Sequence, residues 1–436
     1  MISLFIPDGF HPPANSILVL MSHLSVALKR FSRETFTSFE VRNYRLYYIG
    51  QIISTSGTFM QSIAQAWLVL KISNSGTALG IVSALQYIPI LVFGTLGGVV
   101  ADRFPKRTVL YFTQSAAGIL ALILGVLVVL NQVSLWMVYI LAFCLGWVNV
   151  FDNPARQTFV IEMVGEDKLR NAITLYSSLV NLSRVIGPTI AAGLIALVGL
   201  APCFVLNGIS YTAVVIMLAR MHPDELHPTP RLARSKGQLR EGVRYVLSTP
   251  ILRDTLLMLA IVGTFTFEFQ VSLPLIAQFT FKGDAASYAF LSGSLGIGAV
   301  VGGLAIASQR KNTPSLLIVV GFLFGAGVLG AAFMPTLFLS GVALVFAGVF
   351  SIFFTSLGNT ILQLRSTPEM RGRVMSFWSI AFLGSTTIGG PAVGWFAEVA
   401  GARWGLALGG LAGLTAALLG LINLRRAESR SSNSLT

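Results

Sequence analysis

Long apolar stretches alternate with short polar connections along most of this chain. Twelve apolar blocks can be counted, and most reach the roughly 20 residues that a membrane-spanning helix needs. The blocks cover residues 45–70, 77–101, 108–130, 134–156, 172–198, 202–220, 252–279, 287–307, 314–333, 337–362, 374–398 and 404–424. This pattern predicts an all-α membrane protein with 12 transmembrane helices.

Four of the blocks carry polar side chains at intervals that place them along one face of a helix. The stripes are Gln51, Ser54, Thr58, Gln61 and Gln65 in the first block, Asn149, Asp152, Asn153 and Arg156 in the fourth, Thr264, Glu268 and Ser272 in the seventh, and Ser351, Thr355, Asn359 and Gln363 in the tenth. Polar groups are costly in hydrocarbon, so such stripes usually face the bundle interior or a water-filled cavity. The alternative is hydrogen bonding between helices without any substrate contact.

The composition excludes several classes of protein. Of the 436 residues, 54% are hydrophobic and only 11% are charged, whereas soluble proteins carry about 25% charged residues. A soluble enzyme, a nucleic-acid-binding domain and a disordered protein are therefore excluded. The chain also contains no Walker motif, nucleophile elbow or cluster of metal ligands, so we expect no enzymatic activity, no cofactor and no bound metal.

The formal charge of +13 is explained by topology. Of the 30 Lys and Arg residues, 26 fall in the segments of one membrane face. The other face holds Lys71, Lys282 and Arg403, and Arg184 lies inside a span. Because positive residues accumulate on the cytoplasmic side, we predict an inner-membrane protein with both termini in the cytoplasm.

The predicted spans divide the chain into five parts. A cytoplasmic arm, residues 1–42, precedes a six-helix half over 43–220, and a cytoplasmic linker over 221–251 leads to a second half over 252–424 and a cytoplasmic tail over 425–436. The arm lacks the apolar core and cleavage site of a signal peptide, and Met21 is a second candidate start. Its alternative interpretation is an interfacial helix over 16–36.

Short motifs recur in the two halves at a nearly constant offset. The segment from Gly98 to Arg107 after the second block has a counterpart from Gly303 to Lys311, 205 residues later. Gly187-Pro188 in the fifth block is matched by Gly390-Pro391 in the eleventh, 203 residues later. Such offsets predict two pseudo-symmetric six-helix halves.

These motifs resemble those of the major facilitator superfamily, and the resemblance covers about residues 43–424. Gly98, Asp102, Arg103, Lys106 and Arg107 match its cytoplasmic loop 2–3 motif, with Pro105 where glycine is usual. Gly187-Pro188 is similar to its span-five antiporter motif, with Ser183 and Ala192 in place of glycines. Segments such as 43–51 and 241–246 are similar to its enterobactin-exporter and macrolide-efflux branch.

The resemblance implies roles for several residues. Spans one, four, seven and ten of this superfamily line the central cavity, and the polar stripes fall on those four spans. Asp102 is expected to face the start of span eleven, and Lys106 is expected to pair with Asp152, which together would close the cytoplasmic side. The alternative is that the motif only anchors the topology.

Two charged residues lie near the middle of a span. Glu268 is the only carboxylate in such a position, and burial favours its neutral form, which makes it a candidate proton carrier. Alternatively, it stays protonated and only donates a hydrogen bond. Arg184 either holds an anionic substrate or tunes a carboxylate, or else it caps the backbone carbonyls freed by Pro188.

Together these features predict a proton-coupled exporter of amphiphilic or aromatic small molecules that works by alternating access. We expect a monomer in the lipid bilayer, with a small-molecule substrate and protons as partners and no nucleic acid. An uptake permease or lipid flippase would share the fold. A non-transporting scaffold or receptor is the alternative of another class, although it has no need of four polar stripes or a mid-membrane glutamate.

Overall fold

The computed structural model describes residues 37–227, 238–306 and 312–433, and the ordered elements in these ranges are helices. Most of the predicted arm, including the helix considered over 16–36, and part of the linker lie outside these residues. A short turn of helix at Thr37–Glu40 leads into the first span.

Five long helices form the six spans of the first half. They are α2 (Arg42–Ser73), α3 (Gly76–Arg103), α4 (Lys106–Val129), α5 (Leu135–Leu197) and α6 (Ala201–Ala219). The 63 residues of α5 make two spans because the helix kinks at Gly165, whose φ of 72° and ψ of 177° are not helical. Glycine adopts positive φ without the steric cost that a Cβ imposes.

The second half also has six spans, two of which are interrupted. The first of these, Pro250–Thr280, consists of α8 (Pro250–Ile261), a short π-helix η3 (Val262–Thr266), α9 (Phe269–Leu275) and a second short π-helix η4 (Ile276–Thr280). The other runs through α13 (Pro368–Ser379), the short π-helix η5 (Ile380–Gly384) and α14 (Thr386–Ala400). The remaining spans are α10 (Ala285–Ile306), α11 (Pro314–Phe333), α12 (Leu337–Arg365) and α15 (Ala402–Asn433).

The number of spans agrees with the prediction. Ten helices of the described chain are long and apolar enough to cross a membrane. One of them, α5, crosses twice, and the helix α2, whose polar stripe lowers its hydropathy, supplies the remaining span. The predicted architecture of twelve transmembrane helices in two halves is therefore confirmed.

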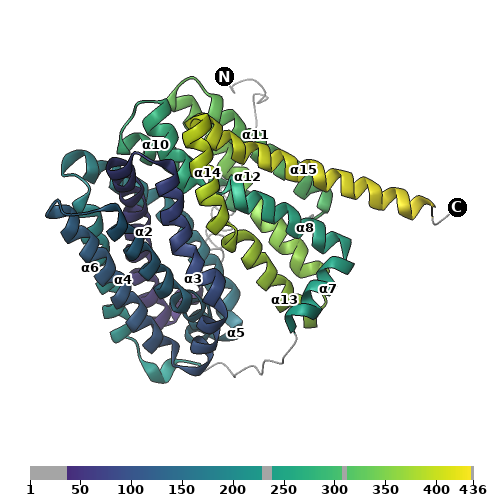
Figure 1. The fold of residues 1–436 in the computed structure, drawn as a ribbon. Helices are drawn as coiled ribbons and strands as arrows, with labels where there is room; N and C mark the ends of the chain where they lie inside the picture. The colour runs from purple at the N-terminus through teal and green to yellow at the C-terminus, as the bar shows by residue number, and fades with distance from the viewer. Residues whose placement is uncertain (1–36, 228–237, 307–311, 434–436) are drawn as a thin grey trace, which may run out of the picture.

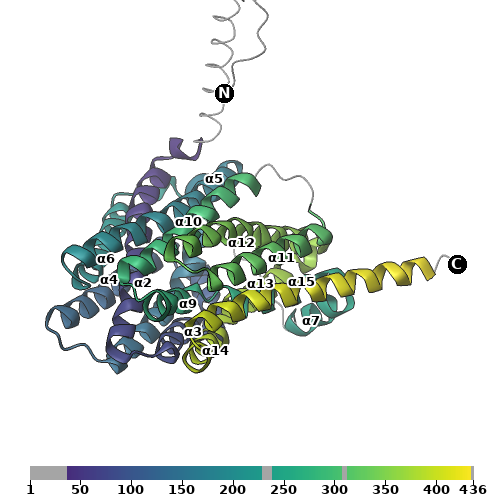
Figure 2. The ribbon, with the colours of Figure 1, turned by 90° about the horizontal axis from the view of Figure 1, so that it is seen from above.

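The halves repeat the same packing. In the first half α3 packs on α5 and α4 on α6, and in the second half α10 packs on α12 and α11 on α15. The two most extensive contacts between the halves join α3 to α14 and α5 to α10. Both views show the first half, in purple to teal, beside the second half, in green to yellow (Figure 1, Figure 2).

The two ends of the bundle differ. One end, here termed the linker face, carries the α3–α4 turn, a short helix η2 (Pro223–Glu225) and the linker helix α7 (Gln238–Ser248). The opposite face carries the turns that follow α2 and α14. The halves lie side by side where α3 meets α14 and are apart at the end that carries α7 and α13 (Figure 1).

Candidate transport cavity and gating residues

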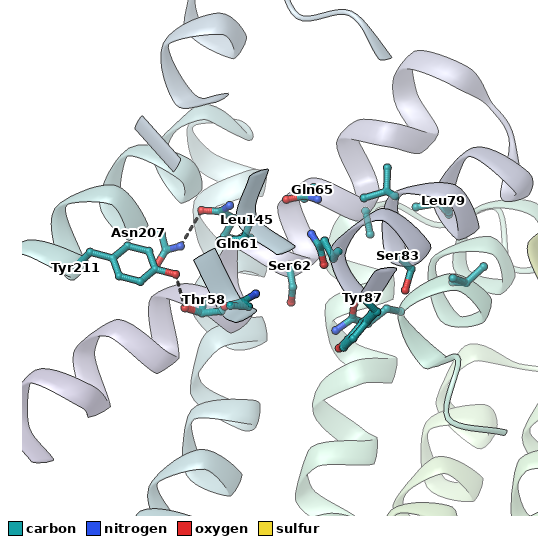
Figure 3. Close-up of a pocket in the computed structure, with 16 residues that line it drawn as sticks. Thr58, Gln61, Ser62, Gln65, Leu79, Ser83, Tyr87, Leu145, Asn207 and Tyr211 are labelled. Atoms are coloured by element: carbon teal, nitrogen blue, oxygen red, sulfur yellow. Dashed lines mark hydrogen bonds between the residues drawn. The ribbon is translucent and has the colours of Figure 1, made fainter. Parts of the chain in front are cut away.

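A cavity of about 200 Å³ lies between α2, α3, α5, α6 and α9. It is termed the amide lobe because its wall includes Gln61, Gln65, Gln86, Asn149, Asn207 and Gln270. The labelled side chains of α2 lie between Asn207 and Tyr211 on one side and those of α3 on the other (Figure 3).

The amides of this lobe are in two different states. The Asn207 Nδ2 donates to Gln61 Oε1 at 2.7 Å, and the Thr58 and Tyr211 hydroxyls are 3.3 Å apart (Figure 3). Gln65, Gln86, Asn149 and Gln270, by contrast, form no hydrogen bond with another described residue. Their donors and acceptors are therefore available to water or to a solute in the cavity.

A second cavity of about 350 Å³ adjoins the first, because Ser62 and Gln270 line both. It is termed the aromatic lobe, after Phe59, Phe267, Phe269, Tyr288, Trp378 and Phe382 in its wall. Trp378 stacks on Phe382 with ring centroids 5.7 Å apart, and Phe267 meets Phe382 edge to face at 4.8 Å. Offset and edge-to-face pairs of this kind leave ring faces for a flat apolar ligand.

The predicted polar stripes contribute only part of these walls. Five of the predicted cavity residues line one of the two lobes, namely Thr58, Gln61, Gln65, Arg184 and Thr355. Five line neither lobe, namely Gln51, Ser54, Thr264, Ser272 and Asn359. A stripe runs the whole length of a helix, whereas each lobe occupies only its middle, so the end positions bond within the protein instead.

Four of the five residues outside the lobes have hydrogen-bond partners in the protein. Gln51 accepts a hydrogen bond from Arg156, and the Thr264 hydroxyl donates to the Ala260 carbonyl at 2.6 Å. Asn359 accepts from Gln363 on the same helix, and the Ser272 hydroxyl donates to the Glu268 carbonyl at 3.0 Å. The seventh stripe fails as a helical pattern because its span breaks at Glu268.

Arg184 faces the aromatic lobe from α5. Its guanidinium carbon lies 5.7 Å from the centre of the Phe59 ring. It forms no hydrogen bond or ion pair with another described residue, so it does not cap the carbonyls freed by Pro188. The nearby Gly187 lets α5 approach α2 closely, since a Cβ there would fall 2.5 Å from the Phe59 Cβ. The Gly187-Pro188 motif thus sets the position of Arg184 over Phe59.

Glu268 lies at the break between η3 and α9, where its φ of −79° and ψ of 40° leave the helical region. The residue is only 2% exposed and its Oε1 has no hydrogen-bond partner among the described residues. The Thr386 hydroxyl is within hydrogen-bonding reach of its carboxyl group. A Cβ at Gly389 would lie 2.9 Å from Glu268 Oε1, so α14 covers the acid closely.

Glu268 is also next to the contact between the two halves. A Cβ on Gly390, the neighbour of Gly389, would be 3.4 Å from Glu268 Oε2 and 3.1 Å from the Gly80 carbonyl oxygen on α3. The acid is therefore enclosed where α14 of the second half packs on α3 of the first. Glu268 itself lines neither lobe, although its neighbours Phe267, Phe269 and Gln270 do.

The loop 2–3 motif lies at the linker face. Gly98 is half-buried in α3, and Asp102 and Arg103 are exposed and form no ion pair with another described residue. Arg107 caps the end of α6, because its Nε donates to the Leu218 carbonyl at 2.8 Å. Among the described residues, Asp102 makes no contact with span eleven, because the two halves are apart at the linker face.

The predicted pairing of Lys106 with Asp152 is wrong. Lys106 Nζ lies 2.6 Å from Glu162 Oε1, and both side chains are almost buried. The helix α5 continues past Arg156 to Gly165, so the acid at the membrane rim is Glu162 and not Asp152. The predicted fourth block ends at Arg156, whereas α5 continues about two turns beyond it to the kink.

Asp152 instead belongs to a buried network of the first half. Its Oδ1 accepts from the Thr113 hydroxyl at 2.7 Å and from Gln114 Nε2 at 2.6 Å. Its Oδ2 accepts two hydrogen bonds from Arg156, whose third nitrogen donates to Gln51 at 3.0 Å. Every oxygen of this carboxylate therefore has a partner.

An inter-half contact at the opposite face was not expected from the sequence. Glu398, at the end of α14, accepts a hydrogen bond from the Thr77 hydroxyl in the first turn of α3. The backbone N–H groups of Gly76 and Thr77 and the Ser75 hydroxyl are within reach of the same carboxylate. Nearby, Gln278 donates to Asn74 at 3.3 Å across the halves. A carboxylate is favoured at a helix N-terminus, so Glu398 stabilises this contact.

The sequence also missed much of the aromatic lobe. Tyr288, Trp378 and Phe382 come from α10, α13 and η5, which carry no polar stripe. Aromatic residues are common in membrane spans, so their presence alone gave no signal. In the described part of the chain no group of three or more His, Cys, Asp or Glu side chains is placed to hold a metal ion.

Comparison with known proteins agrees with this architecture. The model of the family described as "Transmembrane secretion effector" matches residues 33–436. The staphyloferrin A transporter of Staphylococcus aureus is 22% identical over 335 residues, which cover 76% of this chain and 84% of that protein. The enterobactin exporter EntS of Shigella flexneri is 26% identical over 356 residues, which cover 80% of this chain and 84% of that protein.

Solved structures share the fold. A bacterial homologue of the human lysosomal transporter Spinster, in an inward-facing and unoccupied conformation, aligns with a TM-score of 0.66 and 14% identity, covering 88% of this chain and 95% of that one. The nucleoside transporter NupG aligns with a TM-score of 0.67 and 11% identity, covering 88% of this chain and 99% of that one. The chain therefore belongs to the transmembrane secretion effector family of the major facilitator superfamily, and it is a multi-pass inner-membrane transporter, not an enzyme.

Proposed function

We propose that this transporter is a proton-coupled exporter of amphiphilic or aromatic small molecules and works as a monomer by alternating access. The observation that carries the proposal is the pair of adjoining lobes between the halves. One lobe offers amides that no other described residue satisfies, and the other offers ring faces and a cation. A substrate with an apolar ring system and several polar groups fits this division.

The charge distribution supports an orientation of the transporter that is compatible with export. The linker face holds most of the Lys and Arg residues, which supports its placement in the cytoplasm. The halves are in contact at the opposite face through Thr77 and Glu398, so this arrangement would receive a substrate from the cytoplasm. Export also agrees with the name of the enterobactin exporter among the relatives.

Glu268 is the proposed proton carrier, because it can be covered by α14 and α3 at low cost only when neutral. An ionised carboxylate without a partner is unfavourable in a dry contact. When the outer face is open, water would reach the acid and allow it to exchange a proton with the periplasm. Closing that face over a neutral Glu268 would carry the proton inward. Substrate entry into the adjoining lobes would then have to release that proton to the cytoplasm before the outer face reopens, so that one proton moves inward for each molecule exported.

The proposal can be tested in proteoliposomes whose protein has its linker face outward. Enterobactin, staphyloferrin A and a macrolide are offered outside, and uptake is measured with an acidic lumen and after the gradient is collapsed. We expect the acidic lumen to accelerate uptake of at least one compound in wild type and not in Glu268→Gln. Glu166→Gln is the matched control, because Glu166 is exposed beside the α5 kink.

The alternatives predict different results in the same assay. An uptake permease would move the compound only in the reverse direction, and a lipid flippase would move a labelled phospholipid and none of the three compounds. A scaffold or receptor would show no flux in either direction. Acceleration by the gradient that persists in Glu268→Gln would remove the proton-carrier role of this residue.

A further inference from the structure

Arg184 is a cation near the middle of a span without a compensating anion. It has no ion pair or hydrogen bond among the described residues; its guanidinium lies over the Phe59 ring and within electrostatic range of the Tyr87 hydroxyl. Arg156, another arginine of α5, is bound to Asp152 and Gln51. A cation in a membrane interior is costly unless it faces a cavity or meets an anion. Arg184 does face a cavity, so its missing partner would come from the solution.

Two hydroxyl groups in the wall of the aromatic lobe already donate within the protein. The Ser62 hydroxyl donates to the Phe59 carbonyl at 2.7 Å, and the Thr355 hydroxyl donates to the Ser351 carbonyl at 3.0 Å. Their protons are therefore already used, and their oxygen atoms remain as acceptors. Arg184 is left as the lobe's charged donor, with up to five N–H groups for a planar anion.

Neither lobe contains an acidic side chain in its wall. The only formal charge among the wall residues of either lobe is therefore that of Arg184, so the cavity repels organic cations and attracts organic anions. Phe267, Trp378 and Phe382 line the same lobe, and their apolar rings lower the local dielectric constant. An anion that reaches the guanidinium in these surroundings is held more strongly than it would be in water.

We propose that the aromatic lobe binds organic anions that carry an aryl group, with the carboxylate or phenolate on Arg184 and the ring among Phe267, Trp378 and Phe382. The polar remainder of a larger substrate would extend past Ser62 and Gln270 into the amide lobe. This assignment rests on the proposed transport function and adds the charge of its substrate. It also excludes lipophilic cations from the substrates.

The test is equilibrium binding to the full-length protein in nanodiscs, with empty nanodiscs as the background. Three radiolabelled probes share one ring system and differ in charge: 1-naphthoate, 1-naphthalenemethanol and 1-naphthylmethylammonium. Wild type should bind naphthoate about tenfold or more tightly than the neutral alcohol, since a charge-assisted contact is gained. The ammonium probe should not bind above background.

Variants then assign the selectivity to residues. Arg184→Gln should weaken naphthoate about 10- to 100-fold and change the alcohol less than twofold, while Arg184→Lys should retain part of the preference for the anion. Phe382→Leu should weaken both probes together, about two- to tenfold. Arg403→Gln is the matched control, because Arg403 also lies over a phenylalanine, 5.6 Å from the Phe281 ring centre, but at the opposite face.

Several results would overturn the assignment. They are unchanged naphthoate affinity in a monodisperse Arg184→Gln protein, equal binding of the ammonium and carboxylate probes to wild type, or no naphthoate binding to wild type. Because binding needs no gradient, the outcome is independent of the transport assay. Selective anion binding without any flux would contradict the proposed transport cycle and leave the anion site standing.

Discussion

Asp152 and Glu268 are both acids buried inside the membrane region, one in each half, and their surroundings are opposite. Asp152 accepts hydrogen bonds on both oxygens, from Thr113, Gln114 and Arg156. Glu268 has an oxygen without a partner and is covered by α14 where the halves meet. A fully compensated charge stabilises the helices that surround it, whereas an uncompensated one favours a change of protonation or position.

The same contrast separates two arginines of α5, Arg156 and Arg184. Arg156 joins spans one and four through Gln51 and Asp152, inside the first half. Arg184 faces the aromatic lobe, lies over the Phe59 ring and has no ion pair among the described residues. Both compensated residues lie within one half, and both uncompensated residues lie beside the cavity or the inter-half contact. This division indicates that the first group holds a half rigid while the second group serves the transport cycle.

The largest effect is expected from Asp152→Ala, which leaves Arg156 buried without its counter-charge. Removing one partner of a buried ion pair typically costs about 3–5 kcal/mol. We expect a low yield of folded protein and a clearly lower melting temperature in detergent, measured by fluorescence-detected size-exclusion chromatography. The double variant Asp152→Ala with Arg156→Leu should recover part of the loss. Wild-type melting of the single variant would show that the network does not support the fold.

Glu268→Gln should do the reverse, changing the transport cycle while leaving the fold intact. A neutral amide replaces a group that already lacks one hydrogen-bond partner, so folding stability should stay within about 1 kcal/mol of wild type. Substrate exchange between two equal pools should continue and become independent of pH. A melting temperature as low as that of Asp152→Ala would mean that Glu268 is a packing residue, and the contrast between the two acids would fail.

The sequence predicted the spans and halves well because both depend on local properties. The length of an apolar block and the side of its flanking charges are set within about 25 residues. The predicted end of the fourth span, at Arg156, is too early. A charge inside a helix resembles the end of a span unless its partners are known. Those partners, Gln51 and Asp152, come together only through packing.

The site was predictable only in part for the same reason. Glu268 and Arg184 stand out in the sequence as charges in apolar blocks, but whether each is compensated depends on spans far away in the chain. The break at Glu268 lies between two short π-helices. In the sequence, Gly263 and Pro274 are only weak signals of such a break. Glu398 lies at the end of its span, where an acid has no unusual features in the sequence.

A smaller effect should distinguish Gln61, whose amide is hydrogen-bonded within the protein, from Gln65, whose amide is not. Gln61→Leu leaves Asn207 without its partner, so it should cost about 1–3 kcal/mol of stability. Gln65→Leu removes an amide that no other described residue uses, so stability should hold while the order of substrate preference changes. Melting temperatures and competition against a transported probe measure the two effects. Asn359→Leu is the control, because Asn359 lines neither lobe. If substrate preference changed in Asn359→Leu and not in Gln65→Leu, the assignment of Gln65 to the wall of the substrate cavity would be contradicted.

The two ends of the molecule offer a further comparison, between Asp102 and Glu398. Asp102 ends span two at the linker face and is exposed without an ion pair among the described residues. Glu398 ends span eleven at the opposite face and binds the first turn of α3. Both acids lie on the same pair of spans, at opposite ends, and in this arrangement only Glu398 makes a contact between them. The expected contact of Asp102 with span eleven remains a prediction for the arrangement that is closed at the linker face.

The smallest effect is therefore a shift between these arrangements. Glu398→Gln removes the negative charge from the N-terminus of α3, and such an exposed helix–charge interaction is worth only a few tenths of a kcal/mol to about 1 kcal/mol. The population closed at the opposite face should fall about two- to fivefold relative to the open one. Spin labels at Gln132→Cys and Pro335→Cys, in a cysteine-free background, would report this as a longer inter-half distance. Asp102→Asn should shorten the average distance between the same two labels, because it weakens only the arrangement in which the linker face is closed. Unchanged distances in Glu398→Gln, or the same shift in both variants, would show that these acids do not control the two faces in opposition.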